Sequence, residues 1–265
     1  MILNRRAALN GVWLDELDNR IVISGIEPGD GKDNITASDS AAGYGQRFIG
    51  NRRSTLDVSI RFKLLQRSRT EVNMAERAAL IEKVNAWAKD GGVLTVNYKP
   101  NRRMNVVLVQ APGEGSLWDY TKEYAITFRA YAIPYWEDEA ANEAMIGGST
   151  QTGSGTCTIE GSAKTQADVI LENMSGAQIN GCTVSVGGKT MTFSTAILAA
   201  DEALVIDHKD GLVRIRIRDA NNAYRSAMAL REGSDDFMVA PGACDLSYSA
   251  QRACRMTVNW RNRYL

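Results

Sequence analysis

The chain has 265 residues, of which 44% are hydrophobic and 23% are charged, and its formal net charge at pH 7 is zero. This composition is that of a soluble globular protein. No apolar stretch approaches the roughly 18 residues of a membrane-spanning helix, and a zero net charge gives no support for nucleic-acid binding. The first residues lack the apolar segment of a secretory signal, so we expect the chain to fold in a cytosol.

The first half of the chain combines strand patterns with one helix pattern. Apolar residues occupy every second position of Leu56–Leu64, which predicts a half-buried strand. From Val72 to Ala88 the spacing becomes helical, with Asn73 as a cap, Arg77 off the apolar stripe and Gly91-Gly92 as the end. We therefore expect one amphipathic helix that covers one face of a sheet.

Loops and a boundary are predicted from composition. Residues Pro28–Gly45 are rich in Gly, Asp, Ser and Ala, and we expect a long exposed loop with a function or an intersubunit contact. Residues 137–155 begin acidic and alanine-rich and continue rich in Gly, Ser and Thr, which predicts a flexible connector. The predicted domains are therefore 1–136 and 156–265.

The second domain shows strand signals alone. They recur at short intervals, which is typical of an antiparallel sandwich or barrel. The predicted strands include Leu212–Arg218, Leu246–Ser249 and Arg255–Trp260, with Trp260 in the core. The fold class is thus mainly β, with one helix in the N-terminal domain and two β-sandwich-type domains.

The sequence shows no recognisable catalytic, metal or cofactor site. The four cysteines, all in the second half, form no C-x-x-C pair, so we expect buried or partly buried thiols and no zinc. The single histidine, His208, lies in a predicted hairpin turn, where we expect it at the surface without a nucleophile beside it. The acidic clusters Asp235-Asp236 and 137–139 are expected in solvated loops.

Arginines give the candidate contact residues. Alternation places Arg214, Arg216 and Arg218 on one face of a strand, where they need carboxylates on a neighbouring strand, solvent or an anionic partner. The doublet Arg52-Arg53 lies in a turn or at a strand end, and is either solvated or a subunit contact. All five are possible contacts to another subunit or partner.

The order of several loose patterns along nearly the whole chain carries a resemblance. In the first half these are Leu9–Val12, Ile21–Ile23, the strand and helix described above, and Ile133–Trp136. In the second half they are Ile170–Asn173, Leu204–Asp207, Ala240–Ala243 and Trp260–Leu265. In this order the chain resembles the distal tail protein family of long-tailed bacteriophages, also called Dit or the siphovirus tail component.

The resemblance implies a structural protein of the virion tail tip, or baseplate, assembled in the cytoplasm of the host bacterium. Its N-terminal domain would close a hexameric ring, and its C-terminal domain would be a galectin-like β-sandwich. The implied partners are other copies of the chain, the tail tube protein, and tail-tip hub, tail fibre or receptor-binding proteins. DNA would pass through the central channel without specific binding, and no membrane insertion or cofactor is implied.

Two other functions stay open from the residues. One is a carbohydrate-binding module for host-surface recognition, which calls for an exposed Trp or Tyr beside polar side chains in residues 156–265. The other is a tail-associated glycan hydrolase, which calls for two facing carboxylates in a cleft.

Overall fold

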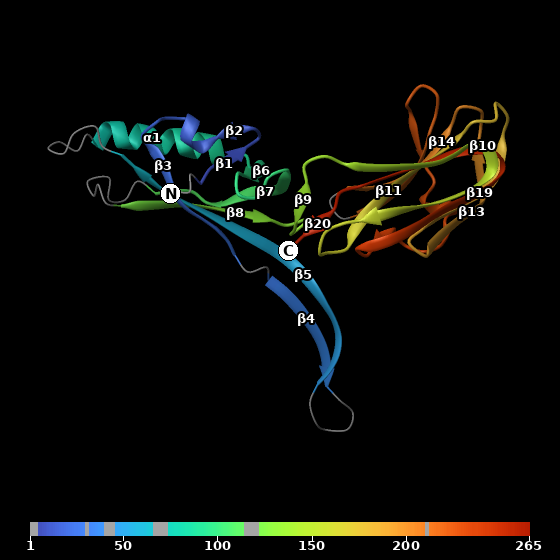
Figure 1. Cartoon of the computed structure of the whole chain (residues 1–265), viewed down its shortest axis with the longest axis horizontal. Coiled ribbons are helices and arrows are strands. Elements are labelled where there is room, and N and C mark those ends of the chain that lie inside the picture. The colour runs from blue at the N-terminus through green and yellow to red at the C-terminus, as the bar shows by residue number, and fades with distance from the viewer. Residues whose placement is uncertain (1–4, 30–31, 40–45, 66–73, 114–121, 210–211) are drawn as a thin grey trace. The chain divides into compact units, whose positions relative to one another are not determined.

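The computed structural model describes the chain outside residues 1–4, 30–31, 40–45, 66–73, 114–121 and 210–211. Its internal contacts divide the chain into two compact units, Met1–Trp136 and Glu137–Leu265 (Figure 1). Both units are mainly β, and the described residues contain one α-helix, in the first unit. No helix in this described part is long and apolar enough to cross a membrane.

The first unit is built on one antiparallel sheet with strand order β2-β1-β6-β7-β8-β5-β3. A short 3-10 helix, Leu14–Glu16, follows β2. As predicted, the alternating apolar residues of Leu56–Leu64 lie buried, facing those of β8. The strands are β1 (Ala7–Leu9), β2 (Val12–Trp13), β3 (Ile21–Pro28), β5 (Gln46–Leu64), β6 (Gly92–Val96), β7 (Arg102–Gln110) and β8 (Glu123–Ala130).

The predicted helix is present as α1, Met74–Ala88, and packs on this sheet. Leu80, Ile81, Val84 and Ala88 are buried on it, and the Trp87 ring meets Phe128 of β8 edge-on, with ring centroids 6.0 Å apart. The placement of Arg77 off the buried stripe was wrong, because this side chain is buried with its Nη2 atom 3.4 Å from the Tyr124 hydroxyl. The proposed cap, Asn73, lies outside the described residues.

The prediction of a long loop over Pro28–Gly45 was wrong for the part that the structure describes, and residues 30–31 and 40–45 lie outside that part. Residues Lys32–Asp39 form strand β4, which pairs in antiparallel register with residues 46–55 of β5. The rest of β5 pairs with β3 and β8, so the β4–β5 hairpin continues beyond the sheet (Figure 1). A two-stranded extension needs no apolar alternation to be held by backbone hydrogen bonds, and for that reason its composition gave no strand signal.

The second unit is one continuous antiparallel sheet with strand order β16-β15-β14-β11-β19-β12-β13-β17. In addition, β10 pairs with β19 and β18 pairs with β11. The strands of this sheet are β10 (Asn142–Ile159), β11 (Thr165–Asn173), β12 (Ile179–Val186), β13 (Lys189–Leu198), β14 (Ala203–Lys209), β15 (Leu212–Arg218), β16 (Tyr224–Ser226), β17 (Glu232–Gly233), β18 (Met238–Val239) and β19 (Gly242–Trp260). The last strand, β20 (Arg263–Tyr264), pairs instead with β9.

The long strand β19 folds this sheet into two layers. Its residues 246–250 pair with β12, whereas residues 254–260 pair with β11. Apolar side chains from both parts share one buried cluster, which gives the sandwich predicted from the sequence. Leu246–Ser249 and Arg255–Trp260 are thus parts of one bent strand, not two strands. Trp260 is buried, as expected.

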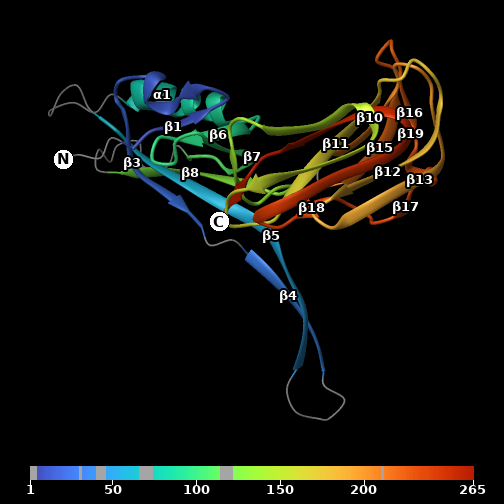
Figure 2. The ribbon, with the colours of Figure 1, turned by 45° about the vertical axis from the view of Figure 1, so that its right-hand side comes forward.

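The prediction of a flexible connector over 137–155 was also wrong. Asn142–Ile159 is strand β10, which pairs with β19 along its whole length (Figure 2). The register shifts between Gly147 and Thr152, where the two strands bend together from one layer to the other. Of the glycines that suggested flexibility, Gly147 and Gly153 lie against the side chain of Tyr248, and Gly155 lies against that of Ile146.

A buried ion pair joins the two ends of the second unit. The Arg263 guanidinium donates to the Glu137 carboxylate at 3.0 Å, and both side chains are less than a tenth exposed. Beside it, the Asn262 amide donates to Asp138 at 2.7 Å. The strand that contains Glu137, β9 (Trp136–Asp138), crosses the division between the two units.

Candidate functional site

One outer face of the second unit is a ladder of paired charges. Arg214, Arg216 and Arg218 lie on one face of β15, as predicted. Arg214 and Arg216 both bind Asp207 of β14, at 2.7 and 2.6 Å, and Arg218 binds Glu172 of β11 at 3.2 Å. Carboxylates on the next two strands, β14 and β11, therefore pair with the row, and contact with another chain remains a prediction.

An exposed aromatic ring borders this ladder. Tyr224 of β16 is 49% exposed, and the Arg216 guanidinium lies 4.2 Å from the centroid of its ring. This is the arrangement of a cation–π pair. One face of the ring is thus covered by Arg216, which leaves the other face and the ring edge as its open surface.

His208 is not a surface residue of a turn. It belongs to strand β14, its side chain is 4% exposed, and its Nδ1 atom lies 2.7 Å from Asp168 Oδ1. The His208 backbone amide donates to the same carboxylate oxygen at 3.0 Å. The prediction failed because Leu204–Ile206, the buried run that precedes His208, continues as a strand through Lys209.

The acidic clusters are engaged in structural pairs. Asp235 binds Arg231, and Asp236 binds Lys189. Burial raises the pKa of Asp236, but hydrogen bonds from Lys189 and from the Met238 amide outweigh burial, so the net pKa is lowered. Glu137 is buried against Arg263 rather than in a solvated loop.

The cysteines are free thiols, as expected from their spacing. Cys157 and Cys244 face each other across β10 and β19, and Cys182 and Cys254 belong to the core. Burial, with a smaller contribution from Cys244, raises the pKa of Cys157 to about 12. Within the part of the chain that the structure describes, no three His, Cys, Asp or Glu side chains gather as metal ligands.

Arg52 and Arg53 lie on the β5 segment that extends beyond the sheet. The register places Arg52 opposite Asn34 and Arg53 opposite Asp33 of β4. The expected turn or strand end is therefore the interior of a hairpin strand. Their role as subunit contacts remains a prediction.

The other outer face of the second unit carries two rows of hydroxyl groups. The strand register aligns Thr152, Ser249, Thr183 and Thr192 in one row across β10, β19, β12 and β13. The next row across the same four strands is Ser154, Ser247, Ser185 and Thr190. We call these eight residues the hydroxyl face. Neighbouring strands lie about 4.8 Å apart, so each row presents hydroxyls at that spacing.

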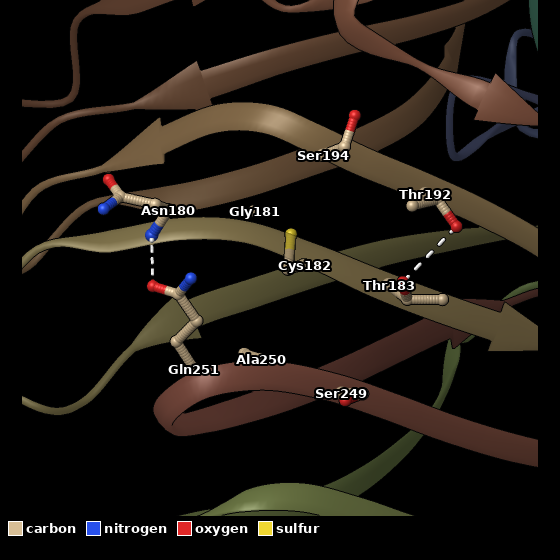
Figure 3. Close-up of a pocket in the computed structure, with 9 residues that line it drawn as sticks. All are labelled: Asn180, Gly181, Cys182, Thr183, Thr192, Ser194, Ser249, Ala250 and Gln251. Carbon is tan, nitrogen blue, oxygen red and sulfur yellow. Dashed lines mark hydrogen bonds between the residues drawn. The ribbon is translucent and has the colours of Figure 1, made fainter.

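A shallow pocket of about 320 Å³ opens at one end of the hydroxyl face (Figure 3). Its lining residues come from β12, from β13 and from the bend of β19. The Thr183 and Thr192 hydroxyls lie 3.3 Å apart, and the Gln251 side-chain oxygen accepts a hydrogen bond from the backbone N–H of Asn180 at 3.1 Å. The lining residues are Asn180, Gly181, Cys182, Thr183, Thr192, Ser194, Ser249, Ala250 and Gln251.

The pocket exists because two strands depart from regular pairing at the same place. The register of β12 against β13 shifts between Asn180 and Cys182, and Gly181 has a φ of +83°. A Cβ atom at Gly181 would lie 3.0 Å from the Ser194 carbonyl oxygen, so glycine suits this bulge. On the other side, β19 leaves β12 after Ala250 and turns toward β11.

The hydroxyl face was not predicted from the sequence, although the sequence contains a signal for it. Ser or Thr alternates with apolar residues or glycine in β10, β12, β13 and β19, as in Thr190-Met191-Thr192-Phe193. Such alternation predicts a strand with one buried face and one short, uncharged polar face. The alignment of these residues into rows depends on the register, which sequence spacing alone does not give.

Comparisons with known proteins identify the fold. No protein-family model and no curated protein matches this sequence. Among solved structures, the Dit (gp 19.1) protein of phage SPP1 superposes with a TM-score of 0.66 at 10% identity. The match covers 98% of this chain and 99% of that one. That protein is described as a paradigm of the hub adsorption apparatus in phages that infect Gram-positive bacteria.

Two structures of the phage P2 baseplate in its activated conformation, with Ca and with Sr, match with lower scores. Their TM-scores are 0.42 and 0.44, at 8% and 7% identity, over 97% of this chain and 98% of each matched chain. The fold assignment therefore rests on the SPP1 protein. Over nearly its entire length, this chain has the fold of the SPP1 Dit protein.

Proposed function

We propose that this protein is the distal tail protein of a long-tailed phage, a structural hub without catalytic activity at the tail tip or baseplate. The observation that carries the proposal is the match to the SPP1 Dit protein across both units, with a TM-score of 0.66. Because a single fold spans 98% of this chain, both units take part in the likeness. The match supports a role in the phage tail. At a sequence identity of 10%, it does not support carrying over individual residue roles from the SPP1 protein.

In this proposal the first unit closes a ring of six copies that joins the tail tube to the tip. The β4–β5 hairpin extends beyond the sheet of that unit and offers a second copy a long paired backbone surface. Arg52 and Arg53 lie on this hairpin, so we assign the predicted subunit contact to them. DNA passes through the ring without specific binding.

The second unit, a galectin-like sandwich in this proposal, is the platform for adhesion components. The charged ladder offers such a partner a stiff surface, because Asp207 and Glu172 hold the guanidinium groups in place. Arg214, Arg216 and Arg218 are the proposed contacts on this side. The site of action is the virion tail, with assembly in the cytoplasm of the host bacterium.

The direct test is the assembly of the purified chain with and without its tail tube protein. We expect rings of six copies by electron microscopy and a matching mass by light scattering. A chain that stays monomeric in both conditions would contradict the ring. Labelling of virions with an antibody against the chain tests where the protein lies in the virion. If the tail tip carries no label, the proposed location at the tail tip is contradicted.

A further inference from the structure

The two outer faces of the second unit differ in chemistry. The charged ladder is covered by long side chains paired with one another, for example Arg218 and Arg255 on Glu172. The hydroxyl face has only short side chains, and each of its eight residues carries a hydroxyl. A hydroxyl group both donates and accepts hydrogen bonds, so these eight residues offer a ligand paired donors and acceptors without charge. At the edge of the face, Glu232 of β17 lies in register with Thr192.

The pocket at the end of this face extends the same chemistry. Asn180 and Gln251 add amide groups to the hydroxyls of Thr183, Thr192, Ser194 and Ser249. Burial raises the pKa of the Cys182 thiol to about 12, so it is uncharged at neutral pH. None of the nine described residues that line the pocket therefore carries a charge there. A volume of about 320 Å³ is at the lower end of the range for small-molecule pockets.

Some polar groups in the pocket are already partly engaged. Thr183 and Thr192 bond each other, and the Ser194 hydroxyl donates to Glu232 at 2.6 Å. Each of these hydroxyl oxygens retains acceptor capacity, since it has two lone pairs. The Ser249 side chain is exposed at the rim. The pocket is thus a fixed set of hydrogen-bonding groups, held in place by the bulge at Gly181.

We propose that this pocket binds a neutral, polyhydroxylated ligand, namely an uncharged sugar unit, either free or as part of a bacterial surface glycan. Sugar hydroxyls match the uncharged donors and acceptors of the lining, whereas a phosphate or carboxylate finds no positive charge among the lining residues. The hydroxyl face continues from the pocket across four strands and accommodates further units of a longer glycan. The site lacks an aromatic platform, so binding is weak for a single sugar and stronger for a chain.

The inference rests on the pocket and not on ring assembly, so the two proposals fail independently. The test uses the full-length protein labelled with ¹⁵N and followed by NMR. The soluble probes are neutral hexoses, 6-deoxyhexoses, N-acetylhexosamines and their trisaccharides at millimolar concentration. Matched sulfated and uronic-acid sugars are the charged probes. A purified neutral wall polysaccharide forms a separate arm, which distinguishes a free sugar from a polymer-bound one.

The pocket variant is Thr183→Val with Thr192→Val, which removes two mutually bonded hydroxyls while keeping side-chain shape and strand preference. Ser249→Arg is a second variant that fills the rim. The control is Thr156→Val, which removes an exposed hydroxyl of β10 outside the pocket. Thermal unfolding verifies that each variant is folded.

We expect at least one neutral sugar or the neutral polysaccharide to shift the resonances of Asn180, Ser249 and Gln251. Affinity should fall at least about tenfold in both pocket variants, which corresponds to roughly 1.4 kcal/mol, and should stay unchanged in the control. The absence of a shift with every neutral probe and with the polysaccharide would overturn the proposal. Preferential binding of charged sugars, or binding that survives both pocket variants, would overturn it as well.

Discussion

The ring of Tyr248 occupies the space that a side chain at Gly153 would need. A Cβ atom at Gly153 would lie 2.3 Å from Tyr248 Cε1, which is far closer than two carbon atoms approach without bonding. The Tyr248 hydroxyl lies within hydrogen-bond distance of two carbonyl oxygens, at 2.5 Å from Cys254 and 3.1 Å from Thr150. The contacts of Tyr248 thereby link the bend of β10 to the bend of β19.

Replacement of Gly153 by alanine should destabilise the second unit by roughly 1–3 kcal/mol, the usual cost of overpacking a core. The added methyl group has to displace a buried aromatic ring that is held at its hydroxyl end. Chemical denaturation followed by tryptophan fluorescence measures the change. Gly113→Ala is the matched control, because a Cβ atom there meets none of the described residues within 4 Å. Equal stability of the two variants would contradict this role of Tyr248.

The buried pair of Glu137 and Arg263 should be strongly coupled. Arg263→Met leaves the Glu137 carboxylate buried without its cation, and we expect a loss of about 3–5 kcal/mol of folding free energy. The double variant Glu137→Gln/Arg263→Met should recover part of this loss, because it leaves no uncompensated charge. A denaturation-based double-mutant cycle measures the coupling.

An exposed ion pair serves as the reference for that cycle. Arg231 binds Asp235, whose side chain is 89% exposed, and Arg231→Met should change stability by less than about 1 kcal/mol. If the cycle at Glu137 and Arg263 gives no more coupling than this surface pair, the buried pair does not hold the ends of the unit together.

Asp18 should make the first unit sensitive to acid. Hydrogen bonds from the Arg20 guanidinium hold the pKa of this carboxyl well below its usual range, against the opposing effect of burial. Its contribution is therefore present above the pKa of an unfolded aspartate, about 3.9, and is lost as the pH falls toward the lower folded-state pKa.

The substitution Asp18→Asn tests the direction of this pH dependence of stability. It should lower the unfolding free energy at pH 7 by an amount on the order of 1 kcal/mol, with a smaller difference from the parent protein at pH 3. Denaturant titrations at both pH values give the two differences, with Asp235→Asn as the exposed control. A difference that grows on acidification would contradict the assignment.

Charge reversal on the β4–β5 hairpin should interfere with assembly. The double variant Arg52→Glu/Arg53→Glu is expected to shift purified oligomers toward monomer, as measured by light scattering over a range of concentrations. Lys164→Glu/Arg252→Glu makes the same change of charge at two exposed positions of the second unit. An unchanged oligomer size in the hairpin variant, or the same shift in both, would remove Arg52 and Arg53 as specific contacts.

The fold could be predicted from sequence wherever one face of an element is buried. Leu56–Leu64 and the helix ending at Ala88 follow this rule, because burial imposes a period of two or of 3.6 residues. The bent strands β10 and β19 could not be predicted in this way, since glycines that pack on Tyr248 resemble those of a linker. Strand β4 also escaped prediction, because it is held by pairing with β5 beyond the sheet.

The candidate site was harder to predict from the sequence than the fold. Alternating Ser and Thr residues are visible in the sequence, but Thr152, Ser249, Thr183 and Thr192 form a row only through the register of four strands. The pairing of Arg214 with Asp207 was an open possibility from the alternation alone. The burial of His208 depends on how far β14 continues, and strand ends are poorly marked in sequence.

Electron microscopy of the full-length protein together with its tail tube protein tests the central proposal most directly. Class averages should show a ring of six copies seated on the end of the tube. Particles in which the chain stays monomeric and leaves the tube end bare would contradict its assignment as a tail hub.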